Sequence, residues 1–349
     1  MPSRFLQCSA ALVGLPLITL SAVMISHAHP ASPGAINETG SGLLLATNKG
    51  AHTLSIIDPQ QGASVAEVPE GGITGHELAA SPDGRTAFVP IYGNSGVGKP
   101  GTDGRNIAVI DIAARKVTNN IEFSHGVRPH CAVFGPKDHM LYVTTELDKT
   151  ISIIDPKTLS IVGAIPTNQA ESHMLAISSD GRRGYTANVG PGTVSVLDLE
   201  ARKPITVIPV SKQVQRISVT PDGSMVFTTD QAKPQVAVID AATNRIKTWI
   251  PLPSIGFAST PTHDGKWLLV MMPGVNKVAI VDLATLKVVH TVDTPGTPQE
   301  ALVRPDDKIA YVSCDVTAQV AAIRTADWTV EKLIPAGKTV DGLAWAPQQ

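Results

Sequence analysis

The sequence predicts an all-β fold, a seven-bladed β-propeller of four-stranded blades, on the strength of two repeated phrases. The first is a short alternating strand that ends in Asp, and the second is a turn of the SPDG type. Copies of the turn lie 42 residues apart from Asp138 onward, which is the size of one blade. The strand phrase ends at Asp58, Asp111, Asp155, Asp198, Asp240 and Asp282, with a degenerate copy at Arg324. The turn phrase contains Asp83, Asp138, Asp180, Asp222, Asp264 and Asp306, with a worn seventh copy at 345–348.

Each repeat contains four short β segments, such as MLAIS, RGYTAN, TVSVLD and ITVIPV in the unit that begins near Ser172. The seventh unit begins with GLAWAP, and its other strands are missing from that part of the chain. We expect LLLATN and HTLSIID near the N-terminus to supply them. Strands from the N- and C-terminal regions then share one blade and close the ring without an exposed edge. The propeller is predicted to be one domain over residues 38–349.

The first residues have the pattern of a secretory signal peptide. Arg4 precedes an apolar stretch over 10–25, and Ser26-His27-Ala28 is a small-x-small cleavage site. We expect a signal peptide over 1–28, cleaved near Ala28, a flexible leader over 29–37, and a periplasmic or secreted mature protein. No later run reaches about 18 apolar residues, so no membrane span is expected.

The amino-acid composition limits the kinds of partner that we expect the protein to bind. Loss of Arg4 leaves 27 basic against 30 acidic residues, a net charge of −3, and no basic, aromatic-rich stripe is visible. We therefore expect no nucleic-acid partner. Cys131 and Cys314 could pair in an oxidising compartment, but they belong to blades far apart around the ring, which favours buried free thiols. We expect a monomer.

The stretch Gly93–Lys99 fits the phosphate-loop pattern G-x-x-x-x-G-K. That motif needs Ser or Thr after the lysine and a helix behind it, whereas Pro100 follows here and NIAVIDI reads as a strand. The first interval between strand phrases exceeds the common period by 11 residues, and this stretch holds the surplus. The sequence therefore predicts a long hairpin loop between the second and third strands of a blade.

The stretches LYVTT, YTANVGPGTVSVLD and AYVSCD resemble the YVTN-repeat (YncE-like) seven-bladed propeller family of exported bacterial proteins. The resemblance covers nearly the whole mature chain and implies the propeller fold. It does not select a function, because that family includes surface-layer proteins, nucleic-acid binders, lactonase relatives and haem-binding propeller domains.

One residue per blade is expected where the innermost strands begin, around the central funnel. Counting back six positions from the proline position of each turn gives a ring in which three consecutive blades carry histidine. The ring consists of His76, His130, His173, Gln215, Phe257, Gln299 and Asp341. The face of this funnel also carries the long hairpin loop, while Asp83, Asp180, Asp222 and Asp264 shape the turns on the opposite face.

The predicted funnel-lining set combines ring positions, the charged residues that follow some of them, and one tyrosine at the end of a second strand. It consists of His76, Glu77, Tyr92, His130, His173, Gln215, Arg216, Gln299, Glu300 and Asp341. Three histidines with an open fourth position form a metal site, so His76, His130 and His173 are candidate ligands for zinc, copper or iron. Alternatively, the imidazoles bond backbone carbonyls and order the funnel wall, or take a metal-free binding or acid–base role.

Two functions follow from these alternatives. The first is a scaffold that binds a small molecule or a protein at the funnel. The second is a metal-dependent enzyme, a lactonase-like hydrolase or an oxidoreductase. In the second, Glu77 or Glu300 serves as base or ligand, and Arg216 binds an anionic or carbonyl-bearing substrate. The sequence assigns no catalytic set.

Overall fold

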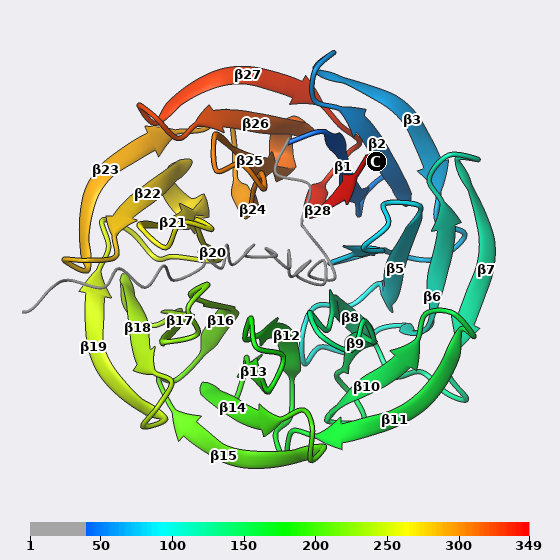
Figure 1. Ribbon diagram of the computed structural model, residues 1–349, viewed down its shortest axis with the longest axis horizontal. Coiled ribbons are helices and arrows are strands. Elements are labelled where there is room, and N and C mark those ends of the chain that lie inside the picture. Colours follow the sequence, from blue (N-terminus) through cyan, green and yellow to red (C-terminus); the bar gives the residue numbers. More distant parts are fainter. Residues whose placement is uncertain (1–39, 349) are drawn as a thin grey trace, which may run out of the picture. The chain divides into compact units, whose positions relative to one another are not determined.

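The computed structural model describes residues 40–348, which form seven sheets, each of four antiparallel strands, around a common axis (Figure 1). The predicted fold class is therefore confirmed. The predicted signal peptide, 1–28, and leader, 29–37, lie outside the described residues.

We number the blades in chain order and give the strands from the innermost outward. Blade 1 consists of β4 (Ala79–Ala80), β5 (Thr86–Gly93), β6 (Asp103–Asp111) and β7 (Lys116–Glu122). Blade 2 consists of β8 (Pro129–Phe134), β9 (Leu141–Thr145), β10 (Thr150–Asp155) and β11 (Ser160–Pro166). Blade 3 consists of β12 (Ser172–Ile177), β13 (Arg183–Asn188), β14 (Thr193–Asp198) and β15 (Lys203–Pro209). Blade 4 consists of β16 (Val214–Val219), β17 (Met225–Asp230), β18 (Gln235–Asp240) and β19 (Arg245–Pro251).

The remaining blades repeat this order. Blade 5 consists of β20 (Ser259–Pro261), β21 (Trp267–Met272), β22 (Lys277–Asp282) and β23 (Lys287–Asp293). Blade 6 consists of β24 (Pro298–Val303), β25 (Ile309–Cys314), β26 (Gln319–Arg324) and β27 (Thr329–Pro335). Blade 7 consists of β28 (Val340–Pro347), β1 (Gly42–Asn48), β2 (Thr53–Asp58) and β3 (Ala63–Pro69).

Blade 7 closes the ring as expected, because its innermost strand comes from the C-terminal region and its other three from the N-terminal region. β28 pairs antiparallel with β1, with Ala344 opposite Leu45 and Ala346 opposite Leu43. All four side chains are apolar, and Leu45, Ala344 and Ala346 are buried. The pairing leaves no open edge at the junction.

The core lies between neighbouring blades. The third strands bury all four central residues, as in β10 and β14, because adjacent blades cover both faces of these strands. The outermost strands, such as β15, alternate between exposed and covered side chains instead. One apolar cluster joins Ile151, Val196 and Val226 from blades 2, 3 and 4, so each blade is held by its neighbours rather than by a core of its own.

The SPDG-type turns on one face are built by local polar contacts. Ser81 Oγ donates to Asp83 Oδ1 at 2.5 Å, and the backbone N–H of Arg85 donates to the same oxygen at 3.1 Å. Gly84 has φ of 70°, a left-handed conformation that glycine adopts without strain. The same contacts recur at Asp180, Asp222 and Asp264, so the turn role expected of these aspartates is confirmed.

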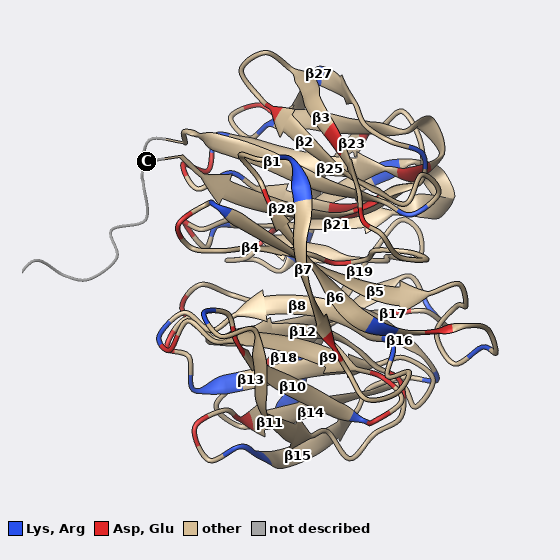
Figure 2. Cartoon of the chain, turned by 90° about the vertical axis from the view of Figure 1, so that its right-hand side faces the viewer, with Lys and Arg blue, Asp and Glu red and all other residues tan. Residues whose placement is uncertain are grey.

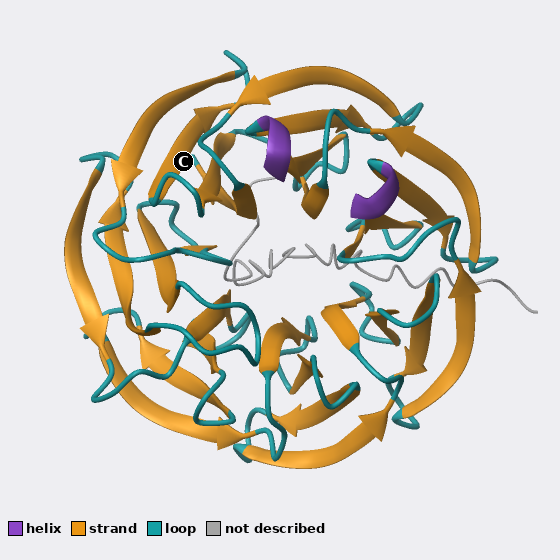
Figure 3. Ribbon diagram, turned by 180° about the vertical axis from the view of Figure 1, so that it is seen from behind, coloured by secondary structure: helices purple, strands orange, loops and turns teal. Residues whose placement is uncertain are grey.

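Helix among residues 40–348 is limited to two short 3₁₀ turns, η1 (Pro273–Val275) and η2 (Asp315–Thr317) (Figure 3). In this part of the chain no helix has the length and apolar character needed to cross a membrane.

Charged residues gather in turns and at strand ends (Figure 2). Cys131 and Cys314 are both buried free thiols, as expected.

The predicted long hairpin loop is confirmed as well. It joins β5 to β6 within blade 1, and a strand rather than a helix follows it. The lysine of the apparent phosphate-loop motif therefore does not stand at a helix N-terminus.

Candidate functional site

β-Bulges position the residues at the start of the innermost strands. The register shifts between Pro129 and Ala132 in β8 and between Gln215 and Ile217 in β16. Arg216, inside the second bulge, has φ of 40°, an unusual conformation for a non-glycine residue. Bulges of this kind redirect a side chain. They bring residues of blades 1, 2, 3, 4 and 7 together at the axis.

The three ring histidines lie in a row across blades 1, 2 and 3. The ring centroids of His76 and His130 are 4.7 Å apart, and those of His130 and His173 are 3.4 Å apart. Thr144 on β9 fixes part of this row, since its Oγ1 accepts a hydrogen bond from the backbone N–H of Cys131 and donates to the carbonyl of His173. All three side chains are at most 13% exposed.

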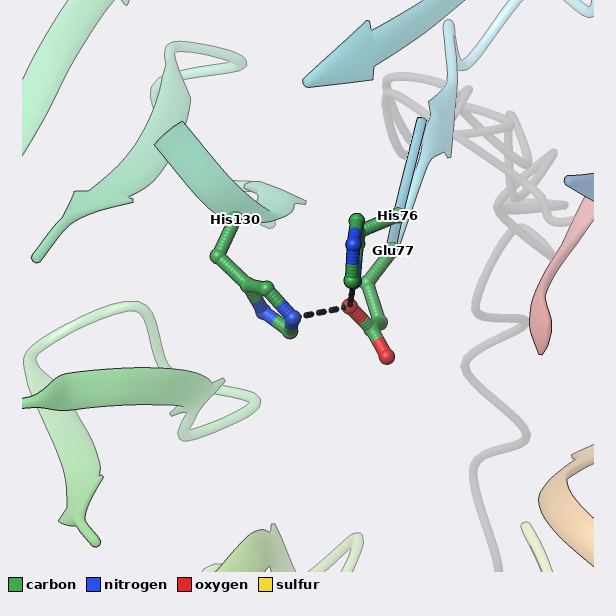
Figure 4. A group of neighbouring side chains, drawn as sticks. All are labelled: His76, Glu77 and His130. Carbon is green, nitrogen blue, oxygen red and sulfur yellow. Dashed lines mark ion pairs between the residues drawn. The ribbon is translucent and has the colours of Figure 1, made fainter. Parts of the chain in front are cut away.

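His76, Glu77 and His130 form the one group of potential metal ligands found among the described residues (Figure 4). One donor atom from each lies within 4.8 Å of the other two. Glu77 Oε2 stands 2.9 Å from His130 Nε2 and 3.9 Å from His76 Nδ1. His173 is not part of this group, and its ring lies against that of His130. The three-histidine set stays a prediction.

The protonation states of this group suit metal binding. Burial, together with neighbouring charge, lowers the pKa of His76 and of His130 well below the usual value, so both imidazoles are neutral. Burial alone would raise the pKa of Glu77, but the Arg216 guanidinium, with help from Lys49, keeps that pKa below its usual value. The Nδ1 atoms of His76, His130 and His173 are buried, and no group of residues 40–348 forms a hydrogen bond with them. Within the described residues, the Nδ1 atoms of these imidazoles therefore do not bond backbone carbonyls, as the alternative interpretation expected.

Arg216 is the centre of an ion cluster directly below the histidines. Its Nη2 lies 2.5 Å from Glu77 Oε1 and 2.9 Å from Asp341 Oδ1, and its Nη1 lies 3.7 Å from Glu300 Oε2. Lys49 Nζ lies 3.0 Å from Asp341 Oδ2. The cluster, which we call the axial ion cluster, consists of Lys49, Glu77, Arg216, Glu300 and Asp341. It joins residues of blades 1, 4, 6 and 7 across the axis.

The carboxyl groups of the axial ion cluster differ in proton affinity. Burial and the carboxylate of Glu77 would raise the pKa of Asp341, but Arg216 and Lys49 hold it below the usual value. Burial, reinforced by Glu77 and Asp341, raises the pKa of Glu300 to about 8 despite Arg216. Three carboxyls therefore face two cations, and Glu300 is the one that takes up a proton first.

Glycine is required where β28 passes this cluster. A Cβ on Gly342 would lie 2.8 Å from the carbonyl oxygen of His76 and from Cα of Glu77. The missing side chain lets the last innermost strand approach the first, and so places Asp341 beside Arg216.

A second set of contacts ties the long hairpin loop to the histidines. Tyr92, near the end of β5, donates to Glu146 Oε2 at 2.5 Å, and Glu146 Oε1 accepts the backbone N–H of Gly98 at 3.2 Å. Arg128 donates to Asp103 Oδ1 at 2.6 Å and to the carbonyl of Lys99 at 2.8 Å. The loop is therefore held over blades 1 and 2, with Tyr92 in ring contact with all three histidines.

Most of the predicted funnel residues come together, with two exceptions. Gln215 accepts the backbone N–H of Arg216 at 3.3 Å, and Gln299 is buried, but within residues 40–348 neither bonds a histidine. Phe257 lies under the Arg216 guanidinium at 5.0 Å. Sequence reasoning missed Lys49 and Arg128. Arg128 carried a usable signal, since it opens the Arg-Pro-His stretch that leads to His130.

A scan against family models matches residues 48–248 to the model described as lactonase, 7-bladed beta-propeller. The chain belongs to this lactonase family. The matched residues span four of the ring positions of the lactonase-family propeller, His76, His130, His173 and Gln215, and stop before Glu300 and Asp341. The finer resemblance to YVTN-repeat propellers stays a prediction.

Two solved structures share the fold of this lactonase-family chain. Hydrazine synthase of Kuenenia stuttgartiensis matches with a TM-score of 0.71 and 21% identity, over 88% of this chain and 99% of that chain. The dihydro-heme d1 dehydrogenase NirN, in complex with DHE, matches with a TM-score of 0.62 and 15% identity, over 90% of this chain and 77% of that chain. No curated protein matches the sequence. At these identities the likeness concerns the fold alone.

Proposed function

We propose that this chain is an exported propeller that binds a small molecule at its funnel through a transition-metal ion held by His76, Glu77 and His130. The observation that carries the proposal is the convergence of three donor atoms from blades 1 and 2 in a buried site. Neutral imidazoles and an ionised carboxylate are the forms in which these side chains bind metal.

The distances support a shared ion. Two donors that each stand about 2.0–2.2 Å from an ion are at most about 4.4 Å apart. The separations of 2.9 and 3.9 Å from Glu77 Oε2 meet this limit, and the remaining spread of up to 4.8 Å needs only a small side-chain rotation. Two histidines and one carboxylate are a donor set of catalytic zinc and of ferrous iron, and both metals keep open positions for a ligand.

A hydrolytic activity is a second candidate, and His173 favours it. Its Nδ1 lies 3.8 Å from Glu146 Oε2, and its ring lies against that of the proposed ligand His130, tilted by 33°. An imidazole with a carboxylate partner beside a metal site is suited to general base catalysis. In a lactone-cleaving reaction, His173 would accept the proton of the attacking water, and the Glu146 carboxylate 3.8 Å away would stabilise the imidazolium that forms. The lactonase description of the family points the same way.

Metal analysis of the mature protein tests the first proposal. We expect about one equivalent of zinc or iron per chain, and loss of the metal in His130→Ala. The matched control is His125→Ala, because His125 is 59% exposed and pairs only with Ser124 and Asp148 on the surface. Metal-free protein that takes up neither zinc nor cobalt would contradict the proposal.

Ligand binding and hydrolysis are separated on the cobalt-loaded protein. Binding of acetohydroxamate at an open position changes the visible spectrum of the cobalt, whether or not the protein is an enzyme. Hydrolysis of a γ-lactone that falls in His173→Ala while the cobalt content stays constant would support the enzyme. A spectral response without hydrolysis would support the binding protein and not the enzyme.

The exported, monomeric state is part of the same proposal. The mass of the mature chain from fractionated cells checks cleavage near Ala28, and light scattering after gel filtration checks the oligomeric state. Full-length protein retained in the cytoplasm would contradict the export.

A further inference from the structure

The propeller axis contains a cavity on the side away from the histidines. It has a volume of about 420 Å³ and is lined by the innermost strands of all seven blades. The cavity extends from Glu77 and Glu300 to the turn residues Pro261, His263 and Pro305. We call it the axial chamber. Its volume is in the lower part of the usual range for small-molecule pockets, about 300–1,000 Å³.

The wall of the axial chamber is mostly apolar. Its polar wall groups include Ser218 and Ser259, which hydrogen bond to each other at 2.8 Å and so offer little to a ligand. Apolar wall residues include Ala132, Leu175, Ile217, Leu302 and Leu343. A ligand in this chamber therefore meets hydrocarbon along these residues, and polar groups at Thr260, His263 and Glu300.

The inner end of the chamber is acidic. Glu300 has a side chain that is 22% exposed, whereas both carboxylate oxygens of Glu77 are inaccessible to solvent. Glu300 Oε2 accepts the backbone N–H of Leu343 at 3.0 Å. Within residues 40–348 no donor reaches Glu300 Oε1. An unpartnered carboxylate oxygen is thus the polar group that a ligand meets at the end of an apolar chamber.

The charges around Glu300 determine the sign of the ligand. When all members are ionised, the axial ion cluster holds three carboxylates, Glu77, Glu300 and Asp341, against two cations, Lys49 and Arg216. One negative charge is left over, and Glu300 is the member that the chamber exposes. A cation at this oxygen neutralises the cluster, whereas an anion adds a second unpaired charge in a poorly solvated place.

We propose that the axial chamber is a second binding site, separate from the histidine site, and that it takes a small apolar amine whose ammonium group pairs with Glu300. The hydrocarbon part of the ligand lies along the apolar wall, with its ammonium end at Glu300 Oε1 and its other end toward the turns of the opposite face.

Calorimetric titration of the mature protein with n-hexylammonium tests this assignment, with n-hexanol and n-hexanoate as probes of equal length. The protein is kept at pH 8.5, where Glu300 is ionised, and in EDTA, so that the histidine site plays no part. We expect hexylammonium to bind more tightly than hexanol, and hexanoate not to bind. Glu300→Gln keeps an acceptor for Leu343 N–H, and we expect it to weaken hexylammonium binding by roughly thirtyfold or more.

Leu302→Trp provides an independent variant, because it fills the chamber without altering the charges. It should abolish hexylammonium binding while leaving metal binding at the histidines intact. Equal binding of hexylammonium and hexanol would overturn the ammonium assignment, and so would tighter binding of hexanoate. Failure of all three probes to bind at millimolar concentration would overturn the site itself, with no bearing on the metal proposal.

Discussion

Arg216 is the residue on which the centre of the molecule depends. It is buried, it adopts a left-handed backbone conformation, and it pairs with carboxylates from blades 1, 6 and 7. Strained residues of this kind persist only where surrounding contacts determine them, and they gather at functional sites. The bulge at Arg216 aims its guanidinium across the axis, where no regular strand position would place it.

We expect Arg216→Met to lower the free energy of unfolding by about 3–5 kcal/mol at pH 7, because it removes the guanidinium that pairs with buried Glu77 and leaves Asp341 with Lys49 alone. Urea denaturation measures the change. Lys277→Met is the control: Lys277 pairs with the exposed Asp293, and a surface pair contributes about 0–1 kcal/mol. A loss below about 1 kcal/mol in Arg216→Met would contradict the role assigned to this cation.

Glu70, between β3 and β4, gives a prediction about pH. Its side chain is buried, Oε2 accepts the backbone N–H of Gly75 at 2.9 Å, and Oε1 has no partner. Burial raises the pKa of Glu70 to about 7. The folded state therefore binds more protons than the unfolded state between the two pKa values, so stability falls as the pH rises from about 4.5 to about 7.

Glu70→Gln removes this loss, because an amide has no proton to give up and still accepts the Gly75 N–H. We expect the variant to be more stable than the parent by up to about 3 kcal/mol at pH 8 and nearly equal to it at pH 4.5. Thermal unfolding at both pH values provides the comparison. A variant that is destabilised equally at the two values would show that Glu70 is needed for packing instead.

The repeat explains which site residues could be predicted. His76, His130, His173 and Asp341 occupy equivalent positions in their units, and Arg216 directly follows the equivalent position Gln215, so the period alone aligns them. Glu146 directly follows a second strand, so the repeat also places it on this face. Lys49 and Arg128 lie in loops, whose positions a periodic pattern does not determine. The distance between Glu77 and His130 depends on side-chain geometry that spacing does not give.

At the scale of elements, the hairpin loop between β5 and β6 is the one large departure from the repeat. Its glycines allow close approaches: a Cβ on Gly104 would lie 1.7 Å from the carbonyl oxygen of Ile91. Arg128 and Glu146 hold the loop from the neighbouring blade. The sequence predicted where this loop begins and ends, but the two residues that fasten it belong to another unit.

Arg128→Leu should release this loop while the blades remain folded. We expect amide hydrogens of residues 94–103 to exchange about tenfold faster or more, since several hydrogen bonds to a charged group are lost. Hydrogen-exchange mass spectrometry resolves this peptide. The control is Arg105→Leu, because Arg105 forms an exposed pair with Glu122. Unchanged exchange in Arg128→Leu would mean that Glu146 alone fastens the loop.

The hydrogen bonds of the strand-end aspartates explain why the repeated strand phrase ends in Asp. In the hairpin after β6, Asp111 Oδ1 accepts the backbone N–H of Ala114 at 2.8 Å, and Asp155, Asp198, Asp240 and Asp282 do the same after their own strands. The residue that made the repeat visible is thus the one that builds the turn to the outermost strand.

At the scale of the whole molecule, the ring depends on the pairing of β28 with β1. We expect a chain that ends at Thr339 to lose this pairing, to expose β1 as an edge strand, and to aggregate. Gel filtration and thermal unfolding check this, with a chain that ends at Pro347 as the control that keeps β28. A monomeric, cooperatively unfolding truncation at Thr339 would show that the ring tolerates an open edge.

This junction also sets the timing of assembly. Thr47 Oγ1 hydrogen bonds to the carbonyl of Gly342, a residue 295 positions further along the chain. Nascent blades 1 to 6 can therefore form in turn while β1 still waits for its partner. Asp341 arrives with that partner, so Arg216 meets its full complement of carboxylates only in the final step. A polypeptide stalled between Arg216 and Asp341 would hold this guanidinium without its last carboxylate, and the axial chamber would lack its wall from blade 7 until the circle was sealed.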